Sequence, residues 1–433
     1  MLLTDSRRHL FTSVFAAVVC FAAYASITAF RKAWNVAGFE GQSFLGLDYK
    51  VVLVITQVFG YMLSKFYGIR FISELKRIGR GKLILLLIAV SWLAWLFFAI
   101  IPPPYNFWAL ALNGFPLGML WGVVFSYVEG RRATDFIGAA LAVSFIFGPG
   151  LAKSVALFSM NNWGVGPYWM PFVTAAVFFL PLLLFVYLLE KIPPPDAADV
   201  SHRTERVPMS RADRRRFLRQ FFSGTFLLVI TYLFVTLLRE IRDGFMADMW
   251  RESGEDFNAG VFAKTEMLIS ITILVLIAAM VAIKNNLKAF ILAQCIMLAG
   301  FVVSGLVTWL YLQGGLSTFY WMTFTGLGLY MTYIPYNSIL FDRLLATFRY
   351  AGNVGFLIYV ADSFGYLASV GVLLSKSVFH LQVNWLQFFT MLVLVTSAAG
   401  IVFIAAGMIY FKKKHDRLMA EPVTAPQVSV VNS

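Results

Sequence analysis

The chain has 433 residues, of which 60% are hydrophobic and only 13% are charged, and its formal net charge is +13. Soluble domains are about half apolar and about a quarter charged, so this composition excludes a water-soluble enzyme of this size. A disordered chain is also excluded, because 43 Phe and 11 Trp side chains cannot all remain solvated. The composition indicates a polytopic membrane protein.

Cysteine and histidine offer neither a disulfide framework nor a metal site. Cys20 and Cys295 each lie inside an apolar run. The four histidines lie in or beside loops, at His9, His202, His380 and His415. The sequence also lacks a phosphate-binding Gly loop followed by Lys and Ser or Thr. We therefore expect no metal, no cofactor and no enzymatic activity.

Apolar runs long enough to cross a bilayer recur through most of the chain, and in a bilayer such runs must be helical. This predicts an all-α protein with twelve transmembrane helices, at about 10–31, 49–69, 83–101, 106–128, 136–160, 168–190, 217–241, 262–283, 288–311, 317–340, 352–375 and 385–411. The first run also resembles a secretory signal, because Ala23-Tyr24-Ala25-Ser26 mimics a cleavage site. We interpret it as an uncleaved first helix.

The basic residues indicate the orientation. Of the 35 Lys and Arg, 25 fall at the two termini, in the even-numbered loops or in the segment 191–219, whereas the loops after helices 3, 5 and 9 carry none. Basic loops stay in the cytoplasm, so we expect both termini to be cytoplasmic in an inner membrane. The positive charge then reflects topology and contact with lipid, and no nucleic-acid partner is expected.

A polar segment divides the chain. It opens with Pro193-Pro194-Pro195, which cannot continue a helix, and closes with Arg214-Arg215-Arg216. We expect two six-helix bundles joined by a cytoplasmic linker and followed by a cytoplasmic tail, with bounds 1–191, 192–216, 217–411 and 412–433.

The two halves contain an internal repeat. Three residues of the first helix recur 208 residues later in the seventh: Tyr24, Thr28 and Arg31 match Tyr232, Thr236 and Arg239. Two further matches follow in order. At an offset of 213, Glu129 and Ala133-Thr134 match Asp342 and Ala346-Thr347. At an offset of 217, Phe147-Gly148 matches Phe364-Gly365. The repeat predicts pseudo-symmetric bundles.

Two six-helix repeats with cytoplasmic termini and a basic central loop resemble the major facilitator superfamily over the whole chain. The loop Ser73–Lys82 is similar to the acidic-x-basic-x-Gly-Arg signature of that superfamily. The resemblance implies two bundles around a central cavity that opens alternately to each side. Composition alone is equally compatible with a channel or a structural subunit.

Arg31 and Arg239 are the leading candidates for substrate ligands. Charged side chains inside a membrane usually face a cavity, and the repeat places these two symmetrically. Two guanidinium groups suit a phosphate or carboxylate through bidentate hydrogen bonds. Tyr24 and Thr28 share the helical face of Arg31, and Tyr232 and Thr236 share that of Arg239. The alternative is that both arginines are interface anchors near the outer ends of their helices.

Three segments are similar to organophosphate:phosphate antiporters, which carry glycerol phosphate and hexose phosphates. They are Tyr24–Trp34, Gly60–Gly68 with its Ser-Lys-Phe, and Leu238-Arg239 followed by Asp243. In that family the arginines of helices 1 and 7 bind phosphate, so the resemblance implies an anionic solute. Glu240 departs from the pattern, and the run 239–243 also resembles bacterial ATP/ADP translocases.

Other polar residues have two interpretations each. Lys65 either reaches the interface or contacts substrate, and Lys153 follows the Gly148-Pro149-Gly150 break, where freed backbone can line a cavity. Tyr330 and Tyr333 are cavity candidates on helix 10.

Four carboxylates are candidates for coupling or gating. Asp362 suits proton coupling or a structural hydrogen bond, and Glu240 suits coupling or pairing with Arg239. Glu129 and Asp342, at the ends of helices 4 and 10, are expected to form gate salt bridges.

The leading hypothesis is a monomeric secondary active transporter for a small organic anion, driven by a counter-anion or by protons. The alternatives are an exporter of drugs or siderophore-like compounds, and a non-transporting membrane subunit on a carrier fold.

Overall fold

The computed structural model describes residues 2–73, 79–128, 131, 134–194, 211–348, 354–378 and 383–420. Within these ranges twelve helices have 18 residues or more, as predicted: α1 (Leu2–Lys32), α2 (Tyr49–Ser73), α3 (Arg80–Ile100), α4 (Trp108–Phe125), α5 (Thr134–Trp163), α6 (Met170–Glu190), α8 (Arg211–Glu252), α9 (Val261–Val281), α10 (Asn286–Leu312), α11 (Thr318–Ser338), α13 (Val354–Val378) and α14 (Trp385–Ala420). The all-α fold of a polytopic membrane protein is confirmed.

Short elements complete the described chain. They are the 3₁₀ helices η1 (Ala33–Val36) and η2 (Tyr105–Phe107), the helix α12 (Leu340–Thr347), and the strands β1 (Ser43–Phe44) and β2 (Leu47–Asp48). The strands form an antiparallel hairpin that pairs Ser43 with Asp48 and Phe44 with Leu47. This hairpin lies between η1 and α2.

Nine of the described helices are long and apolar enough to cross a membrane. α11 does not reach that hydropathy because Thr and Tyr recur along it, yet most of its residues are buried inside the protein. A polar helix is tolerated in a membrane where its polar face packs against other helices rather than lipid.

Two helices extend beyond the predicted spans. α8 begins at Arg211, inside the segment predicted as linker, and α14 continues to Ala420, inside the predicted tail. Helices can project past the hydrocarbon layer because water then hydrates their charged turns, whereas a hydropathy pattern detects only the apolar part. The backbone of α8 leaves helical geometry at Phe221 and Phe245, which separates a middle segment from both ends.

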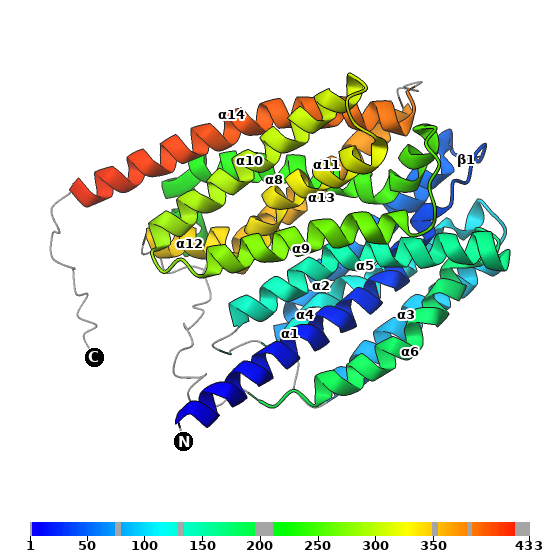
Figure 1. Ribbon diagram of the computed structural model, residues 1–433, viewed down its shortest axis with the longest axis horizontal. Helices are drawn as coiled ribbons and strands as arrows, with labels where there is room; N and C mark the ends of the chain where they lie inside the picture. Colours follow the sequence, from blue (N-terminus) through cyan, green and yellow to red (C-terminus); the bar gives the residue numbers. More distant parts are fainter. Residues whose placement is uncertain are drawn as a thin grey trace.

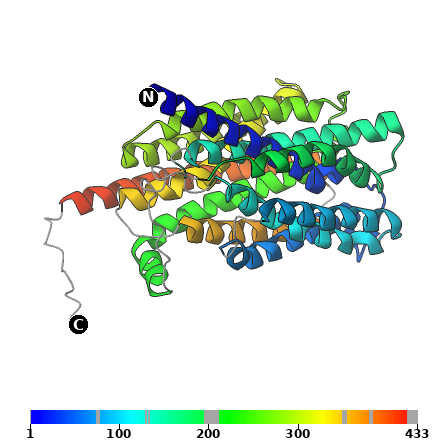
Figure 2. The ribbon, with the colours of Figure 1, turned by 90° about the horizontal axis from the view of Figure 1, so that it is seen from below.

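The helices form two groups, visible in Figure 1 as two layers; in the view from below in Figure 2 the layers overlap, and helices of both run along the long axis. Helices α1 to α6 pack mainly on one another, and so do α8 to α14; we call these groups the N-terminal and C-terminal halves. The halves meet through α5 against α9 and α2 against α13. α1 begins and α14 ends at one end of the bundle, and we call the opposite end the far end (Figure 1).

The repeat recurs in the packing of the two halves. In the N-terminal half a Cβ atom added to Gly148 would lie 2.2 Å from Thr28 Oγ1, and in the C-terminal half one added to Gly365 would lie 2.9 Å from Thr236 Oγ1. The repeated Thr of the first helix of each half therefore packs directly against the repeated Gly of the fifth. Both glycines permit helix contacts that a larger residue would prevent.

The sequence Gly148-Pro149-Gly150 does not break its helix, contrary to our expectation. α5 continues through Pro149 to Trp163. On the other side of α5, a Cβ on Gly150 would lie 2.8 Å from the backbone oxygen of Phe262 on α9. The two glycines serve close packing of α5 against α1 and α9.

We expect Gly148→Ala to lower the stability of the protein by about 1–3 kcal/mol, because the added methyl group overpacks the contact with α1. The control is Gly138→Ala in the same helix, where the nearest atom would be 3.6 Å from the new Cβ. That variant should be neutral or slightly stabilising. Thermal unfolding of the two purified variants in detergent tests this, and equal midpoints would contradict it.

Candidate substrate-binding site

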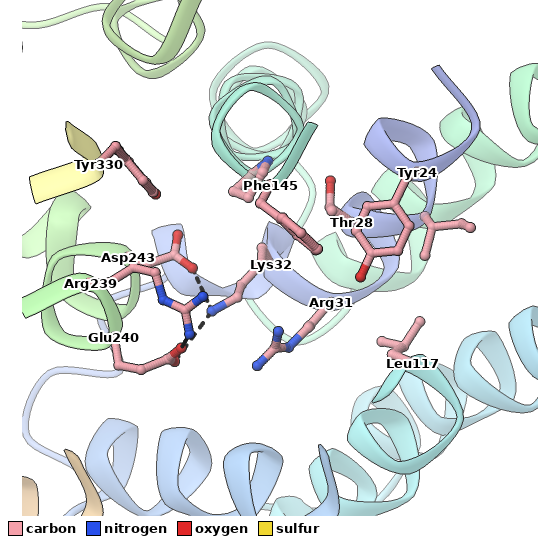
Figure 3. Close-up of a pocket in the computed structure, with 12 residues that line it drawn as sticks. Tyr24, Thr28, Arg31, Lys32, Leu117, Phe145, Arg239, Glu240, Asp243 and Tyr330 are labelled. Atoms are coloured by element: carbon pink, nitrogen blue, oxygen red, sulfur yellow. Dashed lines mark hydrogen bonds and ion pairs between the residues drawn. The ribbon is translucent and has the colours of Figure 1, made fainter. Parts of the chain in front are cut away.

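A cavity lies between the two halves, and charged residues of both line it. Arg31 and Lys32 come from α1, and Arg239, Glu240 and Asp243 from α8 (Figure 3). The remaining wall is less polar and consists of Tyr24, Ile27, Thr28, Leu117, Phe145, Pro149 and Tyr330. The space left open is about 40 Å³, which holds only a few water molecules. A larger solute therefore requires the halves to move apart.

Arg31 is the least paired charge in this cavity. Its guanidinium carbon lies 3.8 Å from the centre of the Tyr61 ring, which stabilises a cation through the ring face. Two of its nitrogens, Nε and Nη2, are buried, and among the described residues neither has a hydrogen-bond partner. A buried donor without a partner is energetically unfavourable. An acceptor that enters the cavity could therefore form favourable hydrogen bonds with the Arg31 guanidinium.

Arg239 lies on the opposite half and is held by its own neighbours. Its Nη2 atom is 2.5 Å from Glu240 Oε1, and its Nη1 donates a 2.5 Å hydrogen bond to the Tyr333 hydroxyl. The guanidinium also lies 4.4 Å from the centre of the Tyr333 ring. Glu240 thus supplies the negative charge that Arg239 needs in the empty cavity.

Lys32 and Lys153 of the N-terminal half share one carboxylate of the C-terminal half. The Nζ atoms of both lysines lie 2.5 Å from Asp243, each on a different carboxylate oxygen. Lys32 is also 3.8 Å from Glu240. Asn35 Nδ2 donates a 3.1 Å hydrogen bond to the backbone oxygen of Asp243.

Residues that the repeat makes equivalent therefore meet across the cavity. Asn35 and Asp243 are 208 residues apart, as are Lys32 and Glu240. The pseudo-symmetry axis accordingly passes between α1 and α8. Lys32 and Glu240 occupy equivalent positions of the two halves but have opposite charges, so they form an ion pair.

A further ion pair is buried next to the cavity. Arg242 Nη1 lies 2.7 Å from Glu266 Oε1, and both side chains are almost fully buried within the C-terminal half. Arg242 Nη2 also donates to the backbone oxygen of Met322, at 3.2 Å. This pair positions α8 against α9 and α11.

Ion pairs also join the halves at the far end. Lys50 Nζ lies 2.5 Å from Asp248 and donates to the backbone oxygen of Asn35 at 2.8 Å. Arg251 bonds to Asp248 at 3.0 Å and to the backbone oxygen of Val36. These contacts connect η1 and α2 with the end of α8, so the halves are in contact at the far end.

The charges around the cavity do not balance. Among the described residues there are five cations and three carboxylates: Arg31, Lys32, Lys153, Arg239 and Arg242 against Glu240, Asp243 and Glu266. Asp362 is a fourth carboxylate, linked to Arg239 through Tyr232 and Tyr333. Even with Asp362 included, the cations exceed the carboxylates.

Nine of the predicted site residues line the cavity or lie directly behind its lining, and Lys153 contacts the lining through Asp243. Arg31, Tyr24, Thr28, Arg239, Glu240 and Tyr330 line the cavity. Tyr333 contacts Arg239, and Tyr232 donates a hydrogen bond to Asp362, so these three lie behind the lining.

Four predicted residues lie elsewhere. Thr236 is fully buried against Gly365. Asp342 is exposed on α12. The side chain of Lys65 and the whole of Glu129 lie outside the described residues.

Asp243 and Arg242 are not among the site residues predicted from the sequence. The seventh helix is predicted to end near residue 241, which leaves both in a loop, whereas α8 continues to Glu252. The charged run 239–243 lowered the hydropathy there. The signal that identifies them is the helical spacing of Arg239, Arg242 and Asp243, which directs them to neighbouring faces of one helix.

We expect Arg242→Met to destabilise the protein by about 3–5 kcal/mol, because Glu266 would then lose its buried partner. The double variant Arg242→Met with Glu266→Leu should recover most of that loss, because no uncompensated carboxylate remains. Thermal unfolding of the two variants tests this. A double variant as unstable as the single one would show that Arg242 acts through other contacts.

The comparisons with known proteins agree with the fold. No curated protein matches the chain. Among solved structures, a bacterial homologue of the human drug peptide transporters PepT1 and PepT2 is similar with a TM-score of 0.58 and 13% identity, over 94% of this chain and 99% of that one. The chain therefore shares the fold of that transporter. Residues 33–414 match a family of unknown function (DUF5690), and because they span most of the sequence, the chain belongs to that family.

Proposed function

We propose that the protein is a secondary active transporter that moves a small organic anion across the cytoplasmic membrane by alternating access. The observation that carries the proposal is Arg31, a cation in a cavity between the halves with two donor atoms unused. An anion with two oxygens, such as a phosphate or carboxylate, satisfies such donors in a bidentate way.

The excess of cations supports the same substrate class. Buried charges need compensation, and five cations against four carboxylates leave room for an added negative charge. Ile27, Leu117 and Phe145 on the less polar wall can contact the organic part of the solute. This charged lining favours an anion carrier over an exporter with a wholly apolar cavity.

In the proposed mechanism, residues 1–191 and 217–411 are the two moving bodies, and their termini are cytoplasmic. The solute binds between Arg31 and Arg239, and the halves rock around it. Transport is coupled to a counter-anion or to protons, with Glu240 and Asp362 as the carboxylates available for proton transfer near Arg239.

A thermal-shift screen tests the substrate class. Purified protein is heated with inorganic phosphate, glycerol phosphate, hexose phosphates, dicarboxylates and a dipeptide. We expect phosphates or carboxylates to raise the midpoint, because a bound ligand stabilises the folded state. A rise with the zwitterionic dipeptide alone would contradict the anion assignment. Counterflow of the stabilising anion in proteoliposomes then distinguishes a carrier from a non-transporting subunit.

Arg31→Lys and Arg239→Lys should each abolish the stabilisation by anions and the counterflow, because Lys lacks the bidentate fork. Arg31→Lys should leave the midpoint of the empty protein almost unchanged, since the nitrogens Nε and Nη2 have no hydrogen bond to lose. Arg251→Lys at the far end is the matched control and should retain anion binding. If both cavity variants still exchange anions, the two arginines are not the ligands.

A further inference from the structure

Asp243 lies between two lysines of the other half. Its two carboxylate oxygens lie 2.5 Å from Lys32 Nζ and 2.5 Å from Lys153 Nζ. It also lines the cavity between Arg31 and Arg239 (Figure 3). A carboxylate held between two ammonium groups has the contacts that a small bound anion would make there.

The charges of this cluster are divided between the halves. The N-terminal half contributes three cations, Arg31, Lys32 and Lys153. The C-terminal half contributes the cations Arg239 and Arg242 and the carboxylates Glu240, Asp243 and Glu266, so its share of the cluster has a formal net charge of −1. The Lys50 to Asp248 pair at the far end follows the same division. Opposite charges on facing surfaces attract, so this arrangement draws the halves together.

Asp243 contributes more to this attraction than the other carboxylates. Glu240 is 2.5 Å from Arg239 of its own half and 3.8 Å from Lys32, and Glu266 pairs with Arg242 of its own half. Asp243, in contrast, is in contact with two cations of the other half. Separating the halves would break both of these close ion pairs, and the two ammonium groups would lose their carboxylate partner.

We propose that Asp243 is an internal competitor for the transported anion. In the empty protein its carboxylate binds Lys32 and Lys153 at the cavity and thereby keeps the halves together, with the far end closed. An anion that enters the cavity takes over the two lysines and releases Asp243, so that opening of the far end is coupled to loading. Asp243 is then a positioning residue. Closure by Asp243 does not depend on the proposed function, whereas its release by an entering anion rests on it.

The first test measures the far end in the absence of any anion. Asn162 at the end of α5 and Gln313 after α10 are exposed on opposite halves, and each is changed to Cys and spin-labelled in a Cys295→Ser background. The parent should show one short distance by pulsed electron paramagnetic resonance, whereas Asp243→Asn should add a longer one. Asp256→Asn in an exposed loop is the control and should match the parent.

The second test measures competition with inorganic phosphate. Without the competing carboxylate, Asp243→Asn should bind phosphate about tenfold more tightly than the parent in a thermal-shift titration. Asp248→Asn removes a carboxylate at the far end only and should leave the affinity unchanged. A purely structural Asp243 predicts the opposite result, namely weaker binding in the variant.

The outcomes separate this proposal from the proposed function. A single short distance in Asp243→Asn, or unchanged phosphate affinity beside normal binding by the parent, would overturn the role of Asp243. A longer distance in a protein that no anion stabilises would retain the closure by Asp243 and refute the anion carrier. If Asp243→Asn does not fold, the charge-balanced double variant with Lys153→Gln replaces it, and an unchanged distance there overturns the closure.

Discussion

The structure depends on compensation of charge where water is excluded. A buried ammonium or guanidinium group must find an anion, and in this protein most of those anions are supplied by α8. Glu240 neutralises Arg239, and Asp243 neutralises Lys32 and Lys153. Arg31 lies against the face of the Tyr61 ring. The contact between the halves at the cavity and the proposed specificity both follow from how these few charges are paired.

The repeat explains how such an arrangement arises from one sequence motif. A Tyr-Thr-Arg stripe recurs on α1 and on α8, and in each half the Thr packs on a Gly of the fifth helix. The arginines therefore face each other across one cavity. The halves then diverged at equivalent positions, so that Lys32 faces Glu240 and Asn35 faces Asp243. Symmetry positions the site, and the departures from symmetry give it opposite charges on its two walls.

Much of the fold could be predicted because the bilayer imposes simple rules on the sequence. All twelve predicted runs correspond to helices, with α6 ending at Glu190 just before the Pro run. The exceptions share one cause. α8 and α14 are longer than their apolar segments, and hydropathy does not detect helical turns that carry charge. That same error placed Asp243 outside the seventh helix and therefore outside the predicted site.

The sequence by itself determined the class of protein, the number and order of the helices, and the pairing of Arg31 with Arg239 by repeat. These features follow from composition, from the length of apolar runs and from internal similarity, which are properties of the chain read in one dimension. Only the tertiary structure decided which charges meet: that Asp243 lies between two lysines, that Thr236 packs on Gly365, and that Arg31 keeps unused donors. Ion pairing depends on distances of a few ångströms between distant segments, and local patterns do not specify such distances.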